Sequence, residues 1–195
     1  MSDLAFPPLA WPQGPDRLPR QNPADYTPAQ AAAAAALIAS PRGEVRGPFV
    51  PLMRSPELMD LTQQLGAFLR YRCSVPEALR EWAICIIARL WRQPYEWHAH
   101  AALAHQAGVA RETLSALRAG DTPPMSADEA VIWRFITQLH ADQFVSDPVW
   151  ADTRTLLGET GAVELCALCG YYTLLAMVLN VARVPVPGEA FAFPD

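Results

Sequence analysis

The sequence predicts an all-α protein of about seven or eight helices, because helix starts are marked repeatedly and strands are not. Candidate N-caps followed by proline at the first helical position occur at Thr27 and Pro28, and again at Ser55 and Pro56. No segment alternates apolar and polar residues with the period of two that is typical of a half-buried strand, and no Asn-Gly or Asp-Gly pair marks a hairpin. We therefore expect a helical domain without a sheet.

The expected helices are separated by proline, glycine or short polar turns. Two of them begin with a capping box, formed by Ser74 with Glu77 and by Ser126 with Glu129, and Gly108 is placed to end another. The helix that follows Ser74 is apolar on nearly every side in its later turns, which predicts a central position. In order, the expected helices lie within residues 27–40, 54–71, 74–91, 95–108, 111–120, 126–142, 147–158 and 162–184.

The composition favours a globular protein with one domain. Of the 195 residues, 51% are hydrophobic and 18% are charged, which provides enough apolar material for a sizeable core. Residues 1–27 are rich in proline and poor in periodic apolar positions, so we expect an N-terminal arm in front of a helical domain over residues 28–195. We expect this arm to lie on the domain or on a neighbouring subunit.

The charge pattern narrows the class of partner and the compartment. The net charge is −5 and no basic cluster occurs, so we expect neither nucleic acid nor a membrane as a partner. The longest apolar run, Leu165–Leu179, is short for a membrane span and suits a buried helix. The N-terminus lacks the pattern of a secretory signal and four cysteines are too few for a disulfide scaffold, so we expect a cytoplasmic protein with reduced thiols.

Residues 81–108 concentrate side chains that can transfer protons. Glu96 and His100 are four residues apart, so they share one face of their expected helix and can interact. His98 and His105 are displaced from His100 by about 200° and about 140° around a helix of 3.6 residues per turn. The histidines are therefore not spaced to chelate a metal ion together, and we expect no metal.

Two interpretations of the acidic residues stay open on spacing alone. Glu81 falls in the apolar central helix, where a buried carboxylate is costly unless it is hydrogen-bonded or functional. The alternative is that Glu81 faces water and that Glu96 and His100 form a surface pair. By default the neighbouring aromatic residues belong to the core, namely Trp82, Trp91, Tyr95 and Trp97.

A second motif is the Cys-x-x-Cys formed by Cys166 and Cys169. Such a pair is typical of redox sites when it opens a helix, where the helix dipole lowers the pKa of a thiol. Here the pair lies within a long apolar helix and is not followed by a histidine one turn later. Packing of two small apolar side chains is therefore the favoured interpretation.

Three segments together resemble the carboxymuconolactone decarboxylase family. The run LREWAICIIARLWRQPYEWHAHAALAHQAGV at residues 79–109 carries the Leu-Arg-Glu and Tyr-Glu-Trp-x-x-His elements of that family. Residues 164–187 are similar to its last helix, with Gly-x-Tyr and Leu-Asn elements, and residues 51–71 resemble its preceding helix. The resemblance covers residues 48–187 and implies an all-helical protein that forms homo-oligomers, as trimers or hexamers.

The wider superfamily of alkylhydroperoxidase-D-like proteins places a Glu, a Cys-x-x-Cys and a His in one frame. On this chain the frame puts the Glu at Glu81 and the His at His100, whereas the two cysteine positions fall on Gln93 and Glu96. The dithiol mechanism is thereby absent at this position, because neither residue can attack a peroxide or form a disulfide. The residues that transfer protons are retained.

The resemblance implies a cofactor-free lyase or proton-transfer enzyme that acts on a small carboxylated lactone or enol acid. In the family's named reaction, CO₂ leaves and the electrons delocalise through the ring alkene into the lactone carbonyl, so no cofactor is needed. His100 is the expected acid/base or oxyanion donor, Glu96 orients it or carries the proton, and Glu81 is the second acid/base. The candidate substrate-binding residues are Tyr95 and Trp97 as pocket walls, with Arg80, Arg89 and Arg54 for the substrate acid.

Two other functions remain as alternatives. An alkylhydroperoxidase-D-like thiol peroxidase, with peroxiredoxin activity, would use Cys166 and Cys169. The second alternative is a non-catalytic oligomeric binding protein on the same scaffold. Solvent exposure of Glu81, Glu96 and His100 would favour that alternative, and a closed pocket around all three would argue against it.

Overall fold

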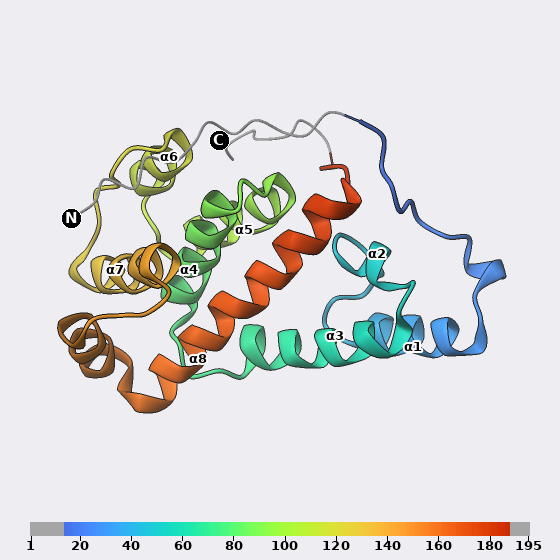
Figure 1. The fold of residues 1–195 in the computed structure, drawn as a ribbon, viewed down its shortest axis with the longest axis horizontal. Coiled ribbons are helices and arrows are strands. Elements are labelled where there is room, and N and C mark those ends of the chain that lie inside the picture. The colour runs from blue at the N-terminus through green and yellow to red at the C-terminus, as the bar shows by residue number, and fades with distance from the viewer. Residues whose placement is uncertain (1–13, 188–195) are drawn as a thin grey trace.

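The structure is a computed structural model that describes residues 14–187, and over this range it is all-helical (Figure 1). The predicted fold class is therefore confirmed. The described residues contain eight α-helices and one short 3-10 helix, and no strand. The 3-10 helix is Pro23–Asp25, and the α-helices are α1 Pro28–Ala39, α2 Phe49–Leu52, α3 Pro56–Tyr71, α4 Glu77–Leu90, α5 Pro94–Gln106, α6 Arg111–Ala119, α7 Ala127–Asp142 and α8 Asp147–Ala182.

Several predicted helix ends are confirmed by their hydrogen bonds. Thr27 caps α1 and forms a capping box with Gln30. The predicted box of Ser126 and Glu129 opens α7, where the serine hydroxyl accepts from the Glu129 N–H at 3.2 Å and the glutamate accepts from the Ser126 N–H at 2.7 Å. Gly108 follows α5 with a left-handed φ of 114°, as its predicted place at the helix end requires.

One predicted cap is wrong. α4 begins at Glu77 directly after Pro76, without a side-chain cap. Ser74 instead donates from its backbone N–H and its hydroxyl to Oε2 of Glu164 on α8, each at 2.6 Å. The spacing of Ser74 and Glu77 suits a capping box, but a carboxylate far away in the sequence binds the same serine.

α8 combines the last two predicted helices. Its hydrogen bonding runs from residue 147 to 182, with an interruption at Gly158, where φ is 69° and ψ is 175°. Residues with a side chain rarely adopt this conformation, so glycine allows the kink. By length and composition alone α8 could cross a membrane, but 50% of its most apolar window is buried inside the molecule, as in the core helix of a folded domain.

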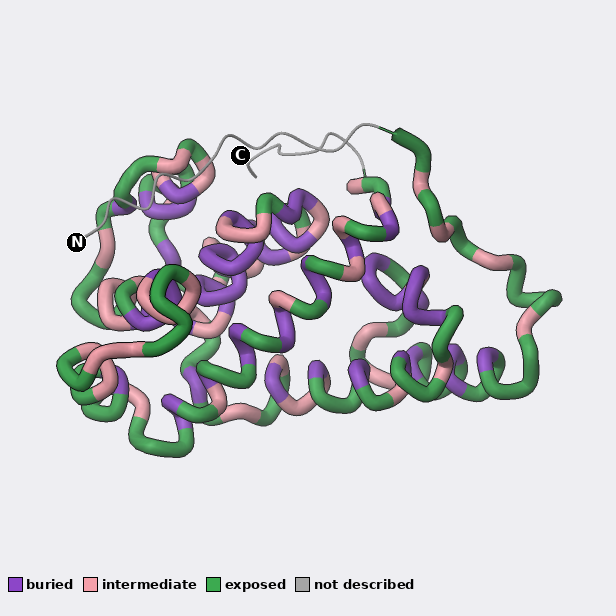
Figure 2. Tube along the Cα trace, viewed as in Figure 1, coloured by how far each residue is buried: buried purple, intermediate pink, exposed green. Residues whose placement is uncertain are grey.

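The core is built around α4. In Figure 1, α8 runs diagonally through the molecule and contacts α4 and α7 on one side and α2 and α3 on the other. α4 also packs against α5 and α6, and its later turns are buried on all sides (Figure 2). The predicted central position of this helix is confirmed, with no exposed surface on Trp82, Ile84, Ile86 and Ile87.

The described part of the N-terminal arm lies on its own domain. The Arg17 N–H donates to the Ala182 carbonyl at the end of α8 at 2.8 Å. Arg54, at the start of α3, donates to the carbonyls of Leu18 and Pro19. Residues 14–27 are thus attached at the end of α8 and directly before the start of α3, while the earlier part of the predicted arm is outside the described residues.

Candidate functional site

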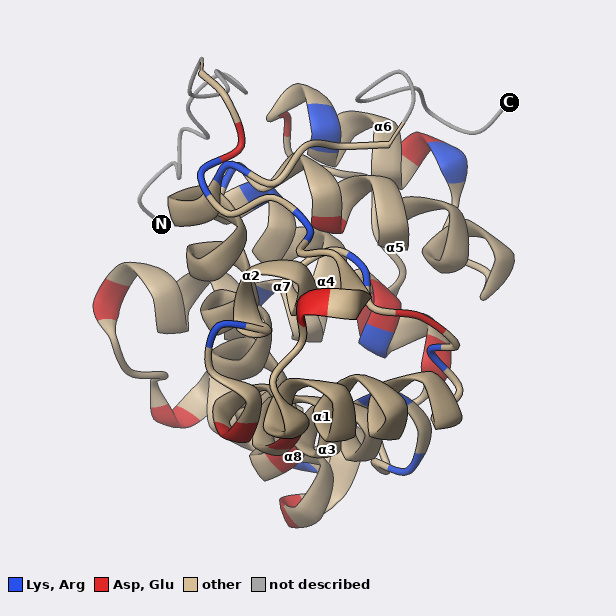
Figure 3. Ribbon diagram, turned by 90° about the vertical axis from the view of Figure 1, so that its right-hand side faces the viewer, with Lys and Arg blue, Asp and Glu red and all other residues tan. Residues whose placement is uncertain are grey.

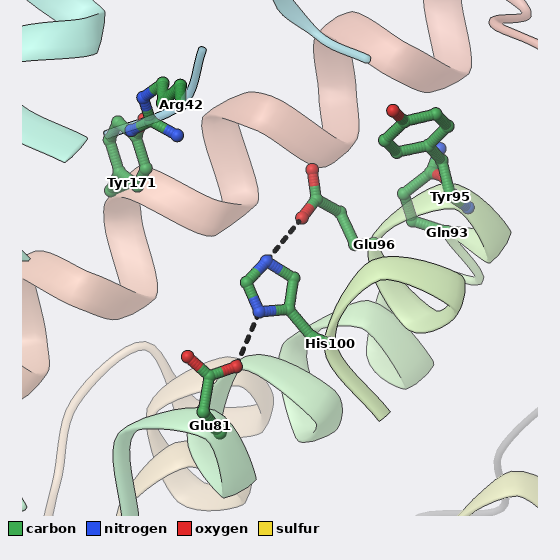
Figure 4. A network of polar contacts seen from close by, with 7 residues as sticks. All are labelled: Arg42, Glu81, Gln93, Tyr95, Glu96, His100 and Tyr171. Atoms are coloured by element: carbon green, nitrogen blue, oxygen red, sulfur yellow. Dashed lines mark hydrogen bonds and ion pairs between the residues drawn. The ribbon is translucent and has the colours of Figure 1, made fainter. Parts of the chain in front are cut away.

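His100 lies between two glutamates, and together they form a buried group that we call the Glu–His–Glu triad (Figure 4). His100 Nδ1 is 2.6 Å from Oε2 of Glu81, and His100 Nε2 is 3.5 Å from Oε2 of Glu96. Glu81 comes from α4, whereas Glu96 and His100 occupy successive turns of α5. The predicted convergence is confirmed, and the surface interpretation is wrong because the three side chains are only 4–5% exposed.

The turn between α4 and α5 is held by Gln93, which occupies the position of the first cysteine in the superfamily frame. Its side-chain oxygen accepts from the Tyr95 N–H at 2.6 Å and caps α5. Its side-chain nitrogen donates to Oδ1 of Asn180 on α8 at 2.8 Å, and Asn180 in turn donates to the Trp91 carbonyl at 3.1 Å. Gln93 therefore fixes the start of α5, and with it the direction in which Glu96 and His100 point.

The surroundings of Glu81 favour its charged form. Burial by itself raises the pKa of this carboxyl, but the hydrogen bond and charge of His100, with the charges of Arg70 and Arg80, outweigh burial and lower the pKa below its ordinary value. Near neutral pH Glu81 is therefore a carboxylate that accepts a hydrogen bond from His100 Nδ1–H. This bond leaves Nε2 as the nitrogen that can gain or lose a proton.

Glu96 is shifted in the opposite direction. Burial raises its pKa, and the charges of His100, Arg70 and Arg42 offset this effect only in part. Its protonated form is thus more accessible than that of an exposed glutamate, and it lies next to Nε2 of His100. Two carboxyl groups with different proton affinities on either side of one imidazole suit acid and base roles.

A cavity of about 630 Å³ opens beside the triad. Glu96 and His100 form part of its wall, together with Tyr95 from α5 and Tyr172 from α8. The rings of His100 and Tyr172 meet edge to face, with centroids 5.2 Å apart. Glu81 is not part of the lining and lies behind His100, so the cavity reaches the two groups that can exchange a proton and has the size of a small-molecule site.

Four arginines also line the cavity, and none of them was predicted as a site residue. Arg42 comes from the loop between α1 and α2, and Arg70 from the last turn of α3. The Nε of each is buried and has no hydrogen-bond partner in the part of the chain that the structure describes. Figure 3 shows the basic and acidic residues of the described chain as short, separated stretches of the ribbon. Guanidinium N–H groups without a partner beside the triad suit the binding of a carboxylate ligand. The four are Arg20, Arg42, Arg46 and Arg70.

The arginines predicted to bind the substrate acid lie elsewhere, and none of them lines this cavity. Arg89 is buried in the core, where its Nε donates to a backbone carbonyl of α6 at 3.1 Å. Arg54 holds the N-terminal arm. Arg80 donates to the carbonyl of Val75 at 3.4 Å and influences the triad only through its charge on Glu81.

Of the two predicted pocket walls, the structure brings one to the cavity. Tyr95 lines the cavity, whereas Trp97 is a core residue that is 2% exposed. Trp97 packs into the core instead and contributes no wall to the cavity. Gly47 approaches the Tyr95 ring so closely that a side chain at this glycine would collide with it.

The signal that could have identified Arg42 is indirect. A Cβ atom added at Gly66, one turn before Arg70 on α3, would collide with the Arg42 guanidinium and the Tyr171 hydroxyl. The same two groups are 3.4 Å apart and share a hydrogen bond. A glycine inside a helix costs about 1 kcal/mol relative to alanine, so its presence indicates a close approach by another segment.

The two cysteines of the Cys-x-x-Cys motif lie away from the cavity lining. Cys166 is exposed and Cys169 is buried. Burial raises the pKa of the Cys169 thiol, which disfavours the thiolate that redox chemistry requires. The surroundings of Cys169 thus fit the packing interpretation.

Within residues 14–187, no group of three or more His, Cys, Asp and Glu side chains is arranged to hold a metal ion. No protein-family model matches the chain, and no curated protein matches it either. The resemblance to carboxymuconolactone decarboxylases thus rests on the sequence elements quoted above, and the function has to be argued from the site.

Proposed function

We propose that the protein is a cofactor-free lyase or proton-transfer enzyme of the carboxymuconolactone decarboxylase type, with a small carboxylated lactone or enol acid as its substrate. The proposal rests chiefly on His100, which is buried between a carboxylate at Nδ1 and a carboxyl group of raised pKa near Nε2. This acid/base group lies in the wall of a cavity that four arginines line. Proton transfer and binding of an acid are thus supported in one place.

In this proposal Arg42 and Arg70 bind the substrate carboxylate. Both line the cavity, and the buried Nε of each has no hydrogen-bond partner among residues 14–187. Arginine offers planar, permanently charged donors that match a carboxylate. These two residues take the role that the sequence suggested for Arg80, Arg89 and Arg54.

The chemistry assigned to the triad is proton delivery during decarboxylation. The bond between the carboxylate carbon and the ring breaks, CO₂ leaves, and the electron pair moves through the alkene into the lactone carbonyl. His100 or Glu96 then gives a proton to the resulting dienolate and recovers it from water. Glu81 holds Nδ1–H of His100 in place and stabilises the imidazolium form, as the carboxylate does in other carboxylate–histidine pairs.

The alternatives fit the described residues less well. For a non-catalytic binding protein, burying two glutamates and a histidine together has a desolvation cost without a matching benefit. For a thiol peroxidase, the buried Cys169 would need to ionise against its surroundings. We therefore rank the lyase first and the peroxidase second.

We also propose that the protein is a cytoplasmic homo-oligomer, a trimer or hexamer as the resemblance implies. Exposed apolar side chains recur along one face of α8 and along α3, and such surfaces are typical of interfaces. They are Val163, Leu174, Met177 and Val181 on α8, and Leu58, Leu61 and Leu65 on α3. Light scattering at micromolar concentration measures the mass, and a monomeric mass would contradict this assembly.

A panel of carboxylated lactones and enol acids tests the reaction, with a peroxide and a thiol reductant assayed in parallel. We expect CO₂ release or isomerisation of at least one lactone without added cofactor, and loss of this activity in His100→Ala. Arg134→Gln is the matched surface control, because Arg134 pairs with Asp152 outside the cavity. Peroxide turnover that depends on a thiol and vanishes in Cys166→Ala/Cys169→Ala would show that the lyase assignment is wrong.

A further inference from the structure

The arginines of the cavity form two groups. Figure 4 shows Arg42 on one side of Glu96 and His100 and Tyr95 on the other. Arg42 and Arg70 are partly buried, and their charges act on Glu96. Arg20 and Arg46 are exposed residues of the cavity lining. They belong to the Tyr95 side, because Gly47, which follows Arg46, lies directly against the Tyr95 ring, and the charges of both arginines act on Tyr95. The cavity therefore has an inner cationic end at Arg42 and Arg70 and an outer cationic end at Arg20 and Arg46. Glu96 and His100 lie between the two ends.

Arg20 reaches the outer cationic end from the N-terminal arm. Its Nη2 donates to the Val45 carbonyl in the loop between α1 and α2. The arm is attached directly before this contact, by the bond from the Arg17 N–H to the Ala182 carbonyl at 2.8 Å and by the bonds from Arg54 to the carbonyls of Leu18 and Pro19. The arm thus supplies a cavity-lining residue from a segment far away in the sequence.

The two arginines of the outer cationic end differ in how their charge is balanced. Arg46 pairs with Glu44 at 3.4 Å, and both side chains are more than half exposed. Arg20 contacts a neutral carbonyl, and no acidic side chain forms an ion pair with it among the described residues. Because its remaining N–H groups still carry an uncompensated charge, Arg20 is the stronger anion-binding residue of this end.

We propose that the N-terminal arm is part of the ligand-binding site and that Arg20 is its specificity-determining residue, which binds an acidic group at the end of the ligand away from His100. The inference rests on the proposed function in taking this cavity as the substrate site. It adds a requirement on the ligand, which carries one acidic group for Arg42 and Arg70 and a second for Arg20. Small molecules with two separated acidic groups meet this requirement, and monoacids do not.

Calorimetric titration of the full chain with unreactive acids tests this inference without any turnover. The probes are pentanoate as a monoacid, and glutarate and adipate as diacids. We expect the wild type to bind a diacid about tenfold more tightly than pentanoate, and Arg20→Gln to lose most of this difference while its affinity for pentanoate stays the same. Arg20→Lys restores part of the difference, because it keeps the charge but not the planar group.

Two further variants distinguish the specific role of Arg20 from the effect of removing any positive charge. Arg70→Gln weakens monoacid and diacid binding alike, because it removes the inner anion-binding group. Arg134→Gln removes an exposed arginine outside the cavity and changes neither affinity. Thermal melts of each variant verify folding, and Arg20→Gln is expected to stay folded because it loses only the hydrogen bond to the Val45 carbonyl.

Equal binding of monoacids and diacids by the wild type, or an equal loss of both in Arg20→Gln, would overturn the inference. The outcome is distinct from that of the proposed reaction, because none of the probes reacts. A protein that selects diacids through Arg20 but turns over no lactone keeps this inference and loses the proposed function. A protein that turns over a lactone, but whose preference for diacids over monoacids is the same in wild type and Arg20→Gln, keeps the proposed function and loses this inference.

Discussion

The Glu–His–Glu triad and the Cys-x-x-Cys motif of α8 both have residue types that enzymes use, but their surroundings differ. The triad joins α4 to α5, and its members contact one another at a cavity lined by arginines. Cys166 and Cys169 lie on one helix, one thiol exposed and the other buried, away from the cavity lining. Motif spacing alone thus predicts chemistry poorly, and what the side chains face predicts it better.

The triad and the Cys-x-x-Cys motif also differ in how their surroundings act on the pKa values of their groups. In the triad, burial is countered by hydrogen bonds and arginine charges, so the two carboxyl groups differ in pKa direction. At Cys169, burial acts first and nothing nearby favours the thiolate enough to reverse it. Neighbouring groups thus support the charged form of Glu81, whereas nothing near the buried Cys169 thiol offsets its burial.

The largest expected effect follows from removing the imidazole. His100→Ala should lower the rate on a lactone substrate by about 10²–10⁴, the usual contribution of a positioned acid or base. His105→Ala is the matched control, because His105 lies on the same helix and binds the Val109 carbonyl outside the cavity. A rate for His100→Ala within twofold of the control would remove the triad from the mechanism.

Replacing Glu81 should have the second-largest effect on the rate. Glu81→Ala leaves the buried Nδ1–H of His100 without its acceptor, which costs about 1–3 kcal/mol in the free energy of unfolding, and it should slow the reaction about a hundredfold. Glu81→Gln keeps an acceptor, so it should lose less stability than Glu81→Ala while the rate still falls. Urea denaturation and initial rates measure the two effects. Equal stability of the two variants would show that the hydrogen bond is not what matters.

The sign of the pH dependence at Glu81 follows from its lowered pKa. The stability that this carboxylate contributes is fully present above its ordinary value of 4.5 and is lost as the pH falls through the lower folded value. Wild type should therefore lose more stability than Glu81→Gln as the pH is lowered below about 4.5. Urea midpoints of the two proteins between pH 3 and 6 measure this difference, and parallel curves would contradict it.

The triad could be predicted because its members lie on two helices that are consecutive in the sequence. Glu81 and His100 are held opposite each other by one tight turn, and Glu96 shares a helix face with His100. Arg80, one of the three arginines expected to bind the substrate acid, is next to Glu81 in the sequence but does not line the cavity. A neighbouring residue on a helix points about 100° away, so it reaches Glu81 by its charge and not by a contact in the cavity.

The cationic lining could not be predicted in the same way. Arg20, Arg42 and Arg70 come from the arm, a loop and the end of α3, and only tertiary packing brings them beside α5. Their charges give no periodic pattern, and Gly66 is the one local sign of the approach. The helices themselves could be predicted from capping and apolar periodicity, which depend on residues close together in the sequence. The predicted cap at Ser74 is wrong because its actual partner, Glu164, is far away in the sequence.

Glu96→Gln should have a smaller effect on the rate and the opposite effect on stability. The amide keeps the size but cannot carry the proton, so we expect about a tenfold slower reaction and a changed pH profile. Because burial raises the pKa of Glu96, wild type loses stability as the pH rises from 4.5 through the folded value, and the variant does not. Near neutral pH the variant should be more stable by about 1 kcal/mol.

Thermal melts across pH 4 to 8 measure that gain, with Glu129→Gln as a control carboxyl outside the cavity, whose amide oxygen can still accept from the Ser126 N–H. The gain should be small at pH 4 and grow above it. A variant that is less stable than wild type at every pH would show that Glu96 is needed as a charge partner of His100 in the folded state.

The smallest effect on the rate is expected from replacing the cysteines of the Cys-x-x-Cys motif. Cys166→Ala/Cys169→Ala should leave the lactone rate within about twofold, because neither thiol borders the cavity or has a supported thiolate. Replacing the buried Cys169 removes one sulfur atom from a packed helix interface, so we expect a loss of about 1 kcal/mol in stability, whereas exposed Cys166 should contribute little. The single variants separate the two, and the rate is measured at a temperature where both remain folded. A large loss of rate in Cys166→Ala, which has no packing to lose, would give the motif a catalytic role that its position on α8 does not suggest.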